Sequence, residues 1–134
     1  MNWKLILQLS LFGFAMGIAT VFVIPSNIEP LFWLAIFLVC AYLIAARAPG
    51  QVFLHGLALG VANGVWMTVF HMLFAARYLA NHPQEAAMMA SMPLPTHPRV
   101  MMLVIGPVIG TCTGVILGLL AIIAAKLMPK RAVA

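Results

Sequence analysis

Charged side chains are scarce in this sequence. Only seven of the 134 residues are Lys or Arg and two are Asp or Glu, whereas 65% are hydrophobic and the mean hydropathy is +1.13. A single water-soluble core of this size could not bury so much apolar surface. The composition therefore excludes a small soluble domain and predicts that a lipid bilayer covers much of the chain.

Motifs of the common enzyme classes are also missing. The chain has no Gly-rich phosphate loop, no H-E-x-x-H pattern and no Gly-x-Ser-x-Gly elbow. Its two cysteines, Cys40 and Cys112, both fall inside apolar runs, where a thiol behaves as a small apolar residue. We therefore expect no enzymatic activity, no cofactor and no disulfide.

Four long apolar runs are present, separated by turn signals such as Pro25 and the Pro49-Gly50 pair. The runs cover residues 5–24, 31–46, 52–79 and 100–127. Since about 20 apolar residues span a bilayer, this pattern predicts one all-α domain, residues 1–134, with four transmembrane helices packed as a small bundle. The third run would form a helix of about 42 Å, longer than a hydrocarbon core of about 30 Å, so we expect it to tilt or protrude.

Lys and Arg are unevenly distributed between the two sides of the predicted bundle. One side carries Lys4, Arg47, Lys126, Lys130 and Arg131, and the other carries Arg77 and Arg99. Because positive residues near span ends stay on the cytoplasmic side, this predicts a multi-pass protein of a bacterial inner membrane with both termini in the cytoplasm. The net charge of +5 is then a topology signal that also favours contact with anionic lipid, and it does not indicate nucleic-acid binding.

Glycine recurs at four-residue intervals in three of the runs. The candidate packing residues are Gly13 and Gly17 in the first run, Gly56, Gly60 and Gly64 in the third, and Gly106, Gly110, Gly114 and Gly118 in the fourth. Within lipid, helices associate through close backbone approach at such small residues. This glycine-zipper spacing predicts tight helix packing. It leaves open whether the partner helix belongs to the same chain, to a second copy or to another subunit.

Polar side chains form a second pattern on the third run. At about 100° per residue, Asn63 and His71 share a helix face with Gly56 and Gly60. Ionisable groups at membrane depth are costly and often functional, so one interpretation places Asn63 and His71 in a proton or solute pathway. In the alternative, Asn63 forms hydrogen bonds across helices and His71 lies near the membrane interface.

The connection between the third and fourth runs, residues 80–98, is unusually apolar. Pro83 suits the first position of a helix and Glu85 its first turn, which predicts a short interfacial helix or an extended lid at the membrane surface. Thioether and imidazole groups that would suit Cu(I) occur here and nearby: Met88, Met89, Met92, Met101, Met102, His82 and His97. Because methionine is also a flexible apolar filler and no repeated ligand motif occurs, we expect no bound metal.

The predicted layout and length are similar to those of the small multidrug transporters. Coupling in that family depends on a membrane-embedded glutamate in the first helix, and the first run here has no acidic residue. The two glutamates of this chain, Glu29 and Glu85, fall in connecting segments. The sequence therefore predicts that no buried carboxylate is available to exchange protons for a cation.

A structural role follows from these patterns. We expect a small accessory or assembly subunit of a membrane complex, or a homo-oligomer, surrounded by lipid and in contact with other membrane subunits or with itself. The alternative is a small transporter or channel that uses the face with Asn63 and His71. Packed side chains along that face favour the first interpretation, and a cavity that reaches both residues favours the second.

Overall fold

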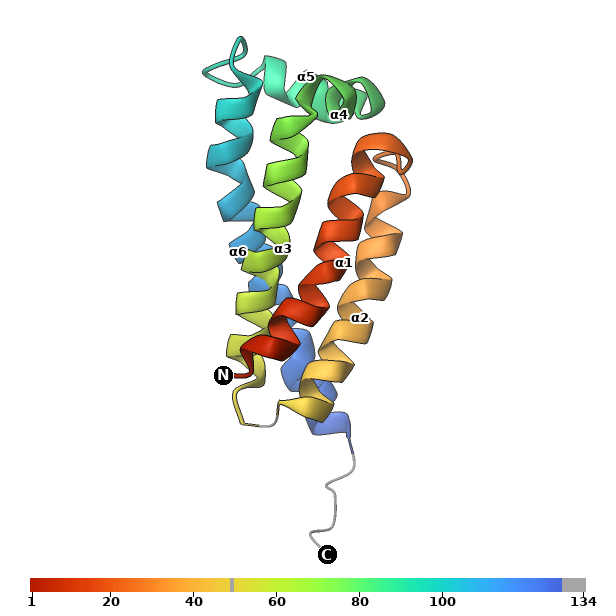
Figure 1. The fold of residues 1–134 in the computed structure, drawn as a ribbon, viewed down its shortest axis with the longest axis vertical. Coiled ribbons are helices and arrows are strands. Elements are labelled where there is room, and N and C mark those ends of the chain that lie inside the picture. The colour runs from red at the N-terminus through yellow and green to blue at the C-terminus, as the bar shows by residue number, and fades with distance from the viewer. Residues whose placement is uncertain (49, 129–134) are drawn as a thin grey trace, which may run out of the picture.

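The described part of the chain, residues 1–48 and 50–128 of a computed structural model, is all-helical. The helices are α1 (Trp3–Phe22), α2 (Glu29–Arg47), α3 (Val52–Leu73), α4 (Ala75–Asn81), α5 (Pro83–Ala90) and α6 (Pro98–Leu127). Helices α1, α2, α3 and α6 are long and apolar enough to cross a membrane, and they pack together as Figure 1 shows. The predicted four-helix membrane fold, with a short helix in the third connection, is confirmed.

Local sequence explains where the first helices begin. Asn2 precedes α1, and its side-chain oxygen accepts a hydrogen bond of 3.1 Å from the Leu5 N–H. Helix α2 begins at Glu29 with Pro30 in its first turn. Proline is tolerated there because the backbone N–H groups of the first turn have no partner within the helix. Gly50 follows α2 with φ of 107°, a left-handed conformation that glycine adopts without strain. The chain can therefore turn sharply into α3.

The third apolar run is not one helix. The expected helix over residues 52–79 is instead two, because α3 ends at Leu73 and α4 begins at Ala75 after a non-helical Phe74. The 22 residues of α3 measure about 33 Å, which matches a hydrocarbon core of about 30 Å. Figure 1 shows α4 and α5 lying across one end of the bundle. The excess apolar length turns to cover that end, here named the α4–α5 end, in place of the expected tilt or protrusion.

The glycines of α3 and α6 face one another within the chain. A Cβ built on Gly56 would lie 2.5 Å from the Gly118 Cα, and one on Gly64 would lie 2.7 Å from the Gly110 Cα. Gly60 and Gly114 form the pair between these two, with an even closer approach. No real side chain tolerates such distances, so these helices touch backbone to backbone.

The remaining glycines of the zipper pattern also contact neighbouring helices. A Cβ on Gly13 of α1 would overlap Asn63, and one on Gly17 would lie 2.7 Å from the Phe70 ring. At the other end of α6, a Cβ on Gly106 would overlap the Thr68 hydroxyl. Helix α3 is therefore the central helix, packed against α1 on one side and α6 on the other.

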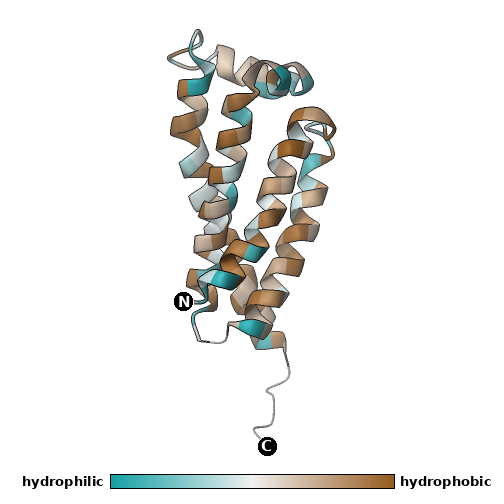
Figure 2. Cartoon of the chain, in the orientation of Figure 1, coloured by the Kyte–Doolittle hydropathy of each residue, from teal (hydrophilic) through white to brown (hydrophobic). Residues whose placement is uncertain are grey.

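The apolar core divides into two clusters along the bundle. One lies near the N-terminus, where α2 packs against α6; its members from these two helices are Cys40, Ala41, Ile44, Leu117 and Ala121. The other lies under α4 and α5 and includes Val21, Tyr78, Met89 and Met102. Figure 2 shows that hydrophobic residues predominate along the four long helices. Many of their large apolar side chains, such as Leu7, Leu38 and Leu119, are exposed, as expected for a lipid-facing bundle.

The four long helices place the start of α1 and the end of α6 at the same end of the bundle. Figure 1 shows the N-terminus and the last turns of α6 at one end of the bundle, opposite α4 and α5. Lys4, Arg47 and Lys126 therefore lie at or near this N-terminal end, whereas Arg77 and Arg99 belong to the α4–α5 end. Lys130 and Arg131, which also entered the charge comparison, lie outside the described residues.

A candidate ligand cleft between α2 and α6

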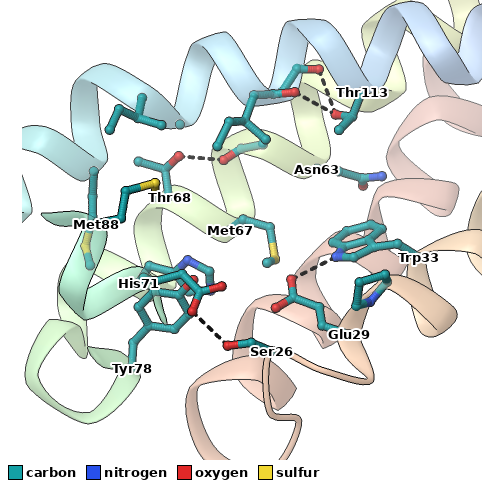
Figure 3. A pocket seen from close by; sticks show the side chains of 18 of the residues that line it. Ser26, Glu29, Trp33, Asn63, Met67, Thr68, His71, Tyr78, Met88 and Thr113 are labelled. Carbon is teal, nitrogen blue, oxygen red and sulfur yellow. Dashed lines mark hydrogen bonds between the residues drawn. The ribbon is translucent and has the colours of Figure 1, made fainter. Parts of the chain in front are cut away.

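A cavity of about 640 Å³ lies between α2, α3 and α6 and is covered by α4 and α5. Most of its wall is apolar, and the apolar side chains include Leu34, Phe37, Met67, Ile105 and Ile109. Figure 3 shows this cavity, here named the α2–α6 cleft, from close by. Its volume is in the range of about 300–1,000 Å³ that is usual for small-molecule sites.

The cleft is closed at one end and open along one side. Towards the N-terminal end, the packing of α2 on α6 ends it, because Cys40 and Ile44 meet Leu117 there within one core cluster. At its two edges, Leu34 of α2 is 55% exposed and Ile109 of α6 is 54% exposed. Since these side chains belong to membrane-crossing helices, the cleft opens sideways towards lipid.

Two carboxylates lie at the α4–α5 end of the cleft. Glu29 accepts a hydrogen bond of 3.1 Å from the Trp33 indole N–H, one turn further along α2. Glu85 of α5 accepts a hydrogen bond of 2.7 Å from the Ser26 hydroxyl. Both bonds are drawn in Figure 3, and both carboxylates line the cleft and are partly buried. Residues from three segments of the chain thus form one acidic group.

A stack of three rings supports this acidic group. Tyr78 of α4 lies between His71 and His82, with ring centroids 3.8 and 4.2 Å away. Burial raises the pKa of Tyr78, and the nearby carboxylates of Glu29 and Glu85 raise it further. Tyr78 is therefore a neutral phenol at physiological pH.

His82 and Glu29 form a close polar pair. His82 is completely buried, and its Nδ1 lies 3.0 Å from the Tyr78 carbonyl oxygen, so Nδ1 carries a proton and donates it. Its Nε2 lies 3.5 Å from a carboxylate oxygen of Glu29 and has no hydrogen-bond partner among the described residues. A neutral imidazole would direct a lone pair at that carboxylate. The arrangement therefore places a buried ring nitrogen beside a carboxylate that lines the cleft.

The two polar residues singled out from the sequence, Asn63 and His71, both line the cleft. Figure 3 shows them on α3 on either side of Met67. The His71 Nε2 lies 2.9 Å from the Thr20 hydroxyl, which itself donates to the Met16 carbonyl oxygen at 2.8 Å. His71 is thus the donor to Thr20 across helices, and its tautomer is set by that bond.

Asn63 has a different environment. It is 3% exposed, and neither its amide nitrogen nor its amide oxygen has a hydrogen-bond partner within residues 1–48 and 50–128. The sequence left open a cross-helix hydrogen bond for Asn63, and the described structure contains none. Buried amides normally have partners. The unused donor and acceptor make Asn63 a candidate for binding a polar group of a ligand or a water molecule.

The carboxylates of the cleft were missed by the sequence interpretation. Assigning Glu29 to a connecting segment was wrong, because it is the first residue of α2. Glu85 does lie in the third connection, in the first turn of the short helix α5. The sequence also predicted that neither carboxylate is buried, whereas both line the cleft and are half-buried. A signal was present in the sequence: Glu29-Pro30 is a typical helix start, and Trp33 four residues later shares its face.

Most of the methionines considered for copper lie in the apolar cluster under α4 and α5: Met89 and Met102 are buried in it, and Met92 and Met101 pack against it. Met88, Met89 and Met102 line the cleft as part of its apolar wall. His97 instead lies beside the Thr96 hydroxyl at 2.8 Å on the exposed surface. Within the described residues, no group of three or more His, Cys, Asp or Glu side chains could hold a metal ion. The absence of copper at the methionines stays a prediction.

Comparison of this chain with protein-family models, curated proteins and solved structures gives no match.

Proposed function

We propose that this protein binds an amphipathic small molecule in the α2–α6 cleft and acts as a small membrane transporter. One observation carries the proposal, namely a cleft of about 640 Å³ whose wall includes Asn63 and His71. The two functions predicted from sequence differ at this point, because a transporter requires a cavity that reaches Asn63 and His71, whereas a structural subunit would have packed side chains there. The polar groups gather at one end and the apolar wall extends away from them, which suits a molecule with a polar head and an apolar body.

The glycine pattern no longer argues for a separate partner. Gly56, Gly60 and Gly64 are occupied by contacts with α6 of the same chain, so the tightest packing surfaces need no second subunit. An accessory or homo-oligomeric subunit is our alternative proposal, and the open side of the cleft favours it. A transmembrane helix of a partner or second copy would cover the exposed edges at Leu34 and Ile109.

We further propose a bacterial inner-membrane location with both termini in the cytoplasm. Lys4, Arg47 and Lys126 at or near the N-terminal end support this orientation. The acidic end of the cleft then lies in the outer half of the bilayer. A ligand would enter sideways from the outer leaflet with its head directed at the membrane surface.

Native mass spectrometry of the detergent-solubilised protein tests the binding step. Neutral, cationic and anionic single-chain amphiphiles are offered separately, and we expect at least one of them to be retained at one molecule per chain. Met67→Trp places a larger side chain in the cleft wall and should reduce the retained fraction at least about tenfold, on the order of 1.4 kcal/mol. Val65→Trp, on the exposed face of the same helix, is the matched control and should bind like the parent.

Two results would contradict the proposal. One is that none of the three amphiphiles is retained, and the other is that Met67→Trp and Val65→Trp bind equally well. Uptake of the retained amphiphile into proteoliposomes then distinguishes a transporter from a subunit that binds without transporting.

A further inference from the structure

The geometry points to the class of ligand: we infer that the α2–α6 cleft binds an amphipathic organic cation, with its charged head at Glu29 and Glu85. This inference rests on the proposed function, because it names the molecule that the cleft would hold. It is carried by the charge balance of the cleft, by the aromatic group beside Glu29 and by the unpartnered amide of Asn63.

The charge balance of the cleft is negative. Two carboxylates line it, and none of its described lining residues is Lys or Arg. The nearby His82 can supply one positive charge at most, and it lies against Glu29. The partner of Glu85 is the neutral Ser26 hydroxyl, at 2.7 Å. Even with His82 protonated, the α4–α5 end of the cleft therefore retains one uncompensated negative charge.

An uncompensated carboxylate in an apolar wall is costly, and a cation that binds there removes part of that cost. An anion would meet the opposite situation, because it would add a second negative charge at short range in a medium of low dielectric constant. The electrostatics of the cleft thus discriminate by the sign of the ligand charge.

An aromatic ring lies beside the acidic group. The Trp33 indole holds Glu29 through its N–H and also lines the cleft, so the ring and the carboxylate flank the same space. Figure 3 shows Trp33 and Glu29 side by side at this position. Indole faces attract cations electrostatically, and they favour alkylated ammonium groups that are weakly hydrated. An organic cation would therefore be attracted both by the carboxylate of Glu29 and by the indole ring of Trp33.

A bare metal ion fits this site poorly. Away from Glu29 and Glu85 the wall consists mainly of Phe37, Met67, Ile105 and similar apolar side chains. Hard cations require six or more oxygen ligands, and the described residues contain no group of three His, Cys, Asp or Glu that could hold an ion. The apolar wall instead suits the hydrocarbon part of an organic cation.

Asn63 is the second, independent indication of a ligand. It belongs to the cleft wall, is more than nine-tenths buried, and has an amide without partners among the described residues. It lies two helix turns along α3 from His71, further towards the N-terminal end. A ligand whose body extends from the carboxylates along α3 would pass alongside Asn63, whose side-chain oxygen also lies close to Gly13 of α1.

A pair of ions with nearly the same size and shape but opposite charge tests the inference. Equilibrium dialysis of the solubilised protein compares tetraphenylphosphonium with tetraphenylborate, and empty detergent micelles provide the partition background. We expect saturable binding of tetraphenylphosphonium at one site per chain and at least tenfold weaker binding of tetraphenylborate. Glu29→Gln and Glu85→Gln should each weaken tetraphenylphosphonium binding at least tenfold.

Matched variants exclude trivial causes. Arg77→Gln changes one exposed charge at the same end of the bundle and should alter binding less than twofold. Because Gln keeps the shape of Glu and still accepts the Trp33 N–H, the Glu variants should elute and melt as folded protein. If one of them does not fold, the other variant and the comparison of the two ions still decide the question.

The outcomes separate this inference from the proposed function. Equal binding of both ions that Met67→Trp removes would overturn the cation inference and leave the proposed function standing. Tetraphenylphosphonium binding that survives Glu29→Gln and Glu85→Gln unchanged would also overturn the inference. Absence of binding for both ions and for every amphiphile of the preceding experiment would overturn both proposals.

Discussion

At the scale of single residues, the cleft combines groups that are costly to bury with groups that stabilise them. His71 has its hydrogen bond to Thr20, and Glu29 has its bond to Trp33. Asn63 lacks a partner for either of its amide atoms within the described residues. Such a side chain lowers the stability of the empty protein, which is a common property of functional sites.

Replacement of Asn63 by Leu tests this interpretation. An unsatisfied buried polar group costs about 1–3 kcal/mol, so the branched apolar side chain should stabilise the ligand-free protein by up to that amount. The measurement is the thermal unfolding temperature in detergent, with the lipid-facing change Val65→Leu as the control for added apolar volume. A lower unfolding temperature for Asn63→Leu would mean that the amide has a stabilising partner, such as an ordered water.

At the scale of helices, α3 and α6 form the most closely packed pair in the described structure. Its glycines let the two backbones touch along three successive turns, from Gly56 and Gly118 to Gly64 and Gly110. Helix α2, by contrast, buries few residues, namely Cys40, Ala41 and Ile44, all in its second half. The first half of α2 borders the cleft, so the side of α2 that is not buried against other helices forms one wall of the site.

Substitution of a zipper glycine should separate α3 from α6. A Cβ on Gly114 would lie 2.6 Å from the Leu57 carbonyl oxygen, and one on Gly110 would lie 3.1 Å from the Gly64 Cα. Gly110→Leu and Gly114→Leu should therefore lower the unfolding temperature in detergent, by the equivalent of about 1–3 kcal/mol or more. The control is Val104→Leu on the exposed face of α6, which should melt like the parent.

If both glycine variants were as stable as Val104→Leu, the close approach of α3 and α6 would contribute nothing to stability. All three variants stay apolar enough to insert into the membrane, so the comparison isolates packing from insertion.

At the scale of the whole molecule, the charge asymmetry predicts the orientation. We expect a cysteine at Ser91, in the turn after α5, to react with a membrane-impermeant thiol reagent in intact cells. A reporter enzyme that works only in the cytoplasm should be active when it is fused after Ala134. The labelling requires replacement of Cys40 and Cys112 by Ala, since both are free thiols.

Labelling of Ser91→Cys only after cell lysis would reverse the orientation. The acidic end of the cleft would then face the cytoplasmic leaflet, and entry from the outer leaflet would have to be abandoned.

Much of the architecture was accessible from sequence. Apolar runs of membrane length are decisive because a backbone in lipid must satisfy its own hydrogen bonds, which leaves the helix as the only local solution for this chain length. The glycine spacing likewise indicated close packing, since a residue without a side chain lets the backbone of any neighbouring helix approach closely. These are properties of short segments, and they hold whatever the rest of the chain does.

The tertiary structure alone decided three matters: the break after Leu73, the partner of each glycine stripe, and the side to which Glu29 and Glu85 point. Each depends on residues distant in sequence. Ser26 and Glu85, for example, are 59 positions apart and yet share a hydrogen bond. The periodicity of a sequence indicates which face of one helix is polar. It does not indicate which neighbouring helix that face contacts, because the contact depends on how all the helices pack together. The cleft is formed by the packing of α2, α3 and α6 and so is a property of the tertiary structure alone.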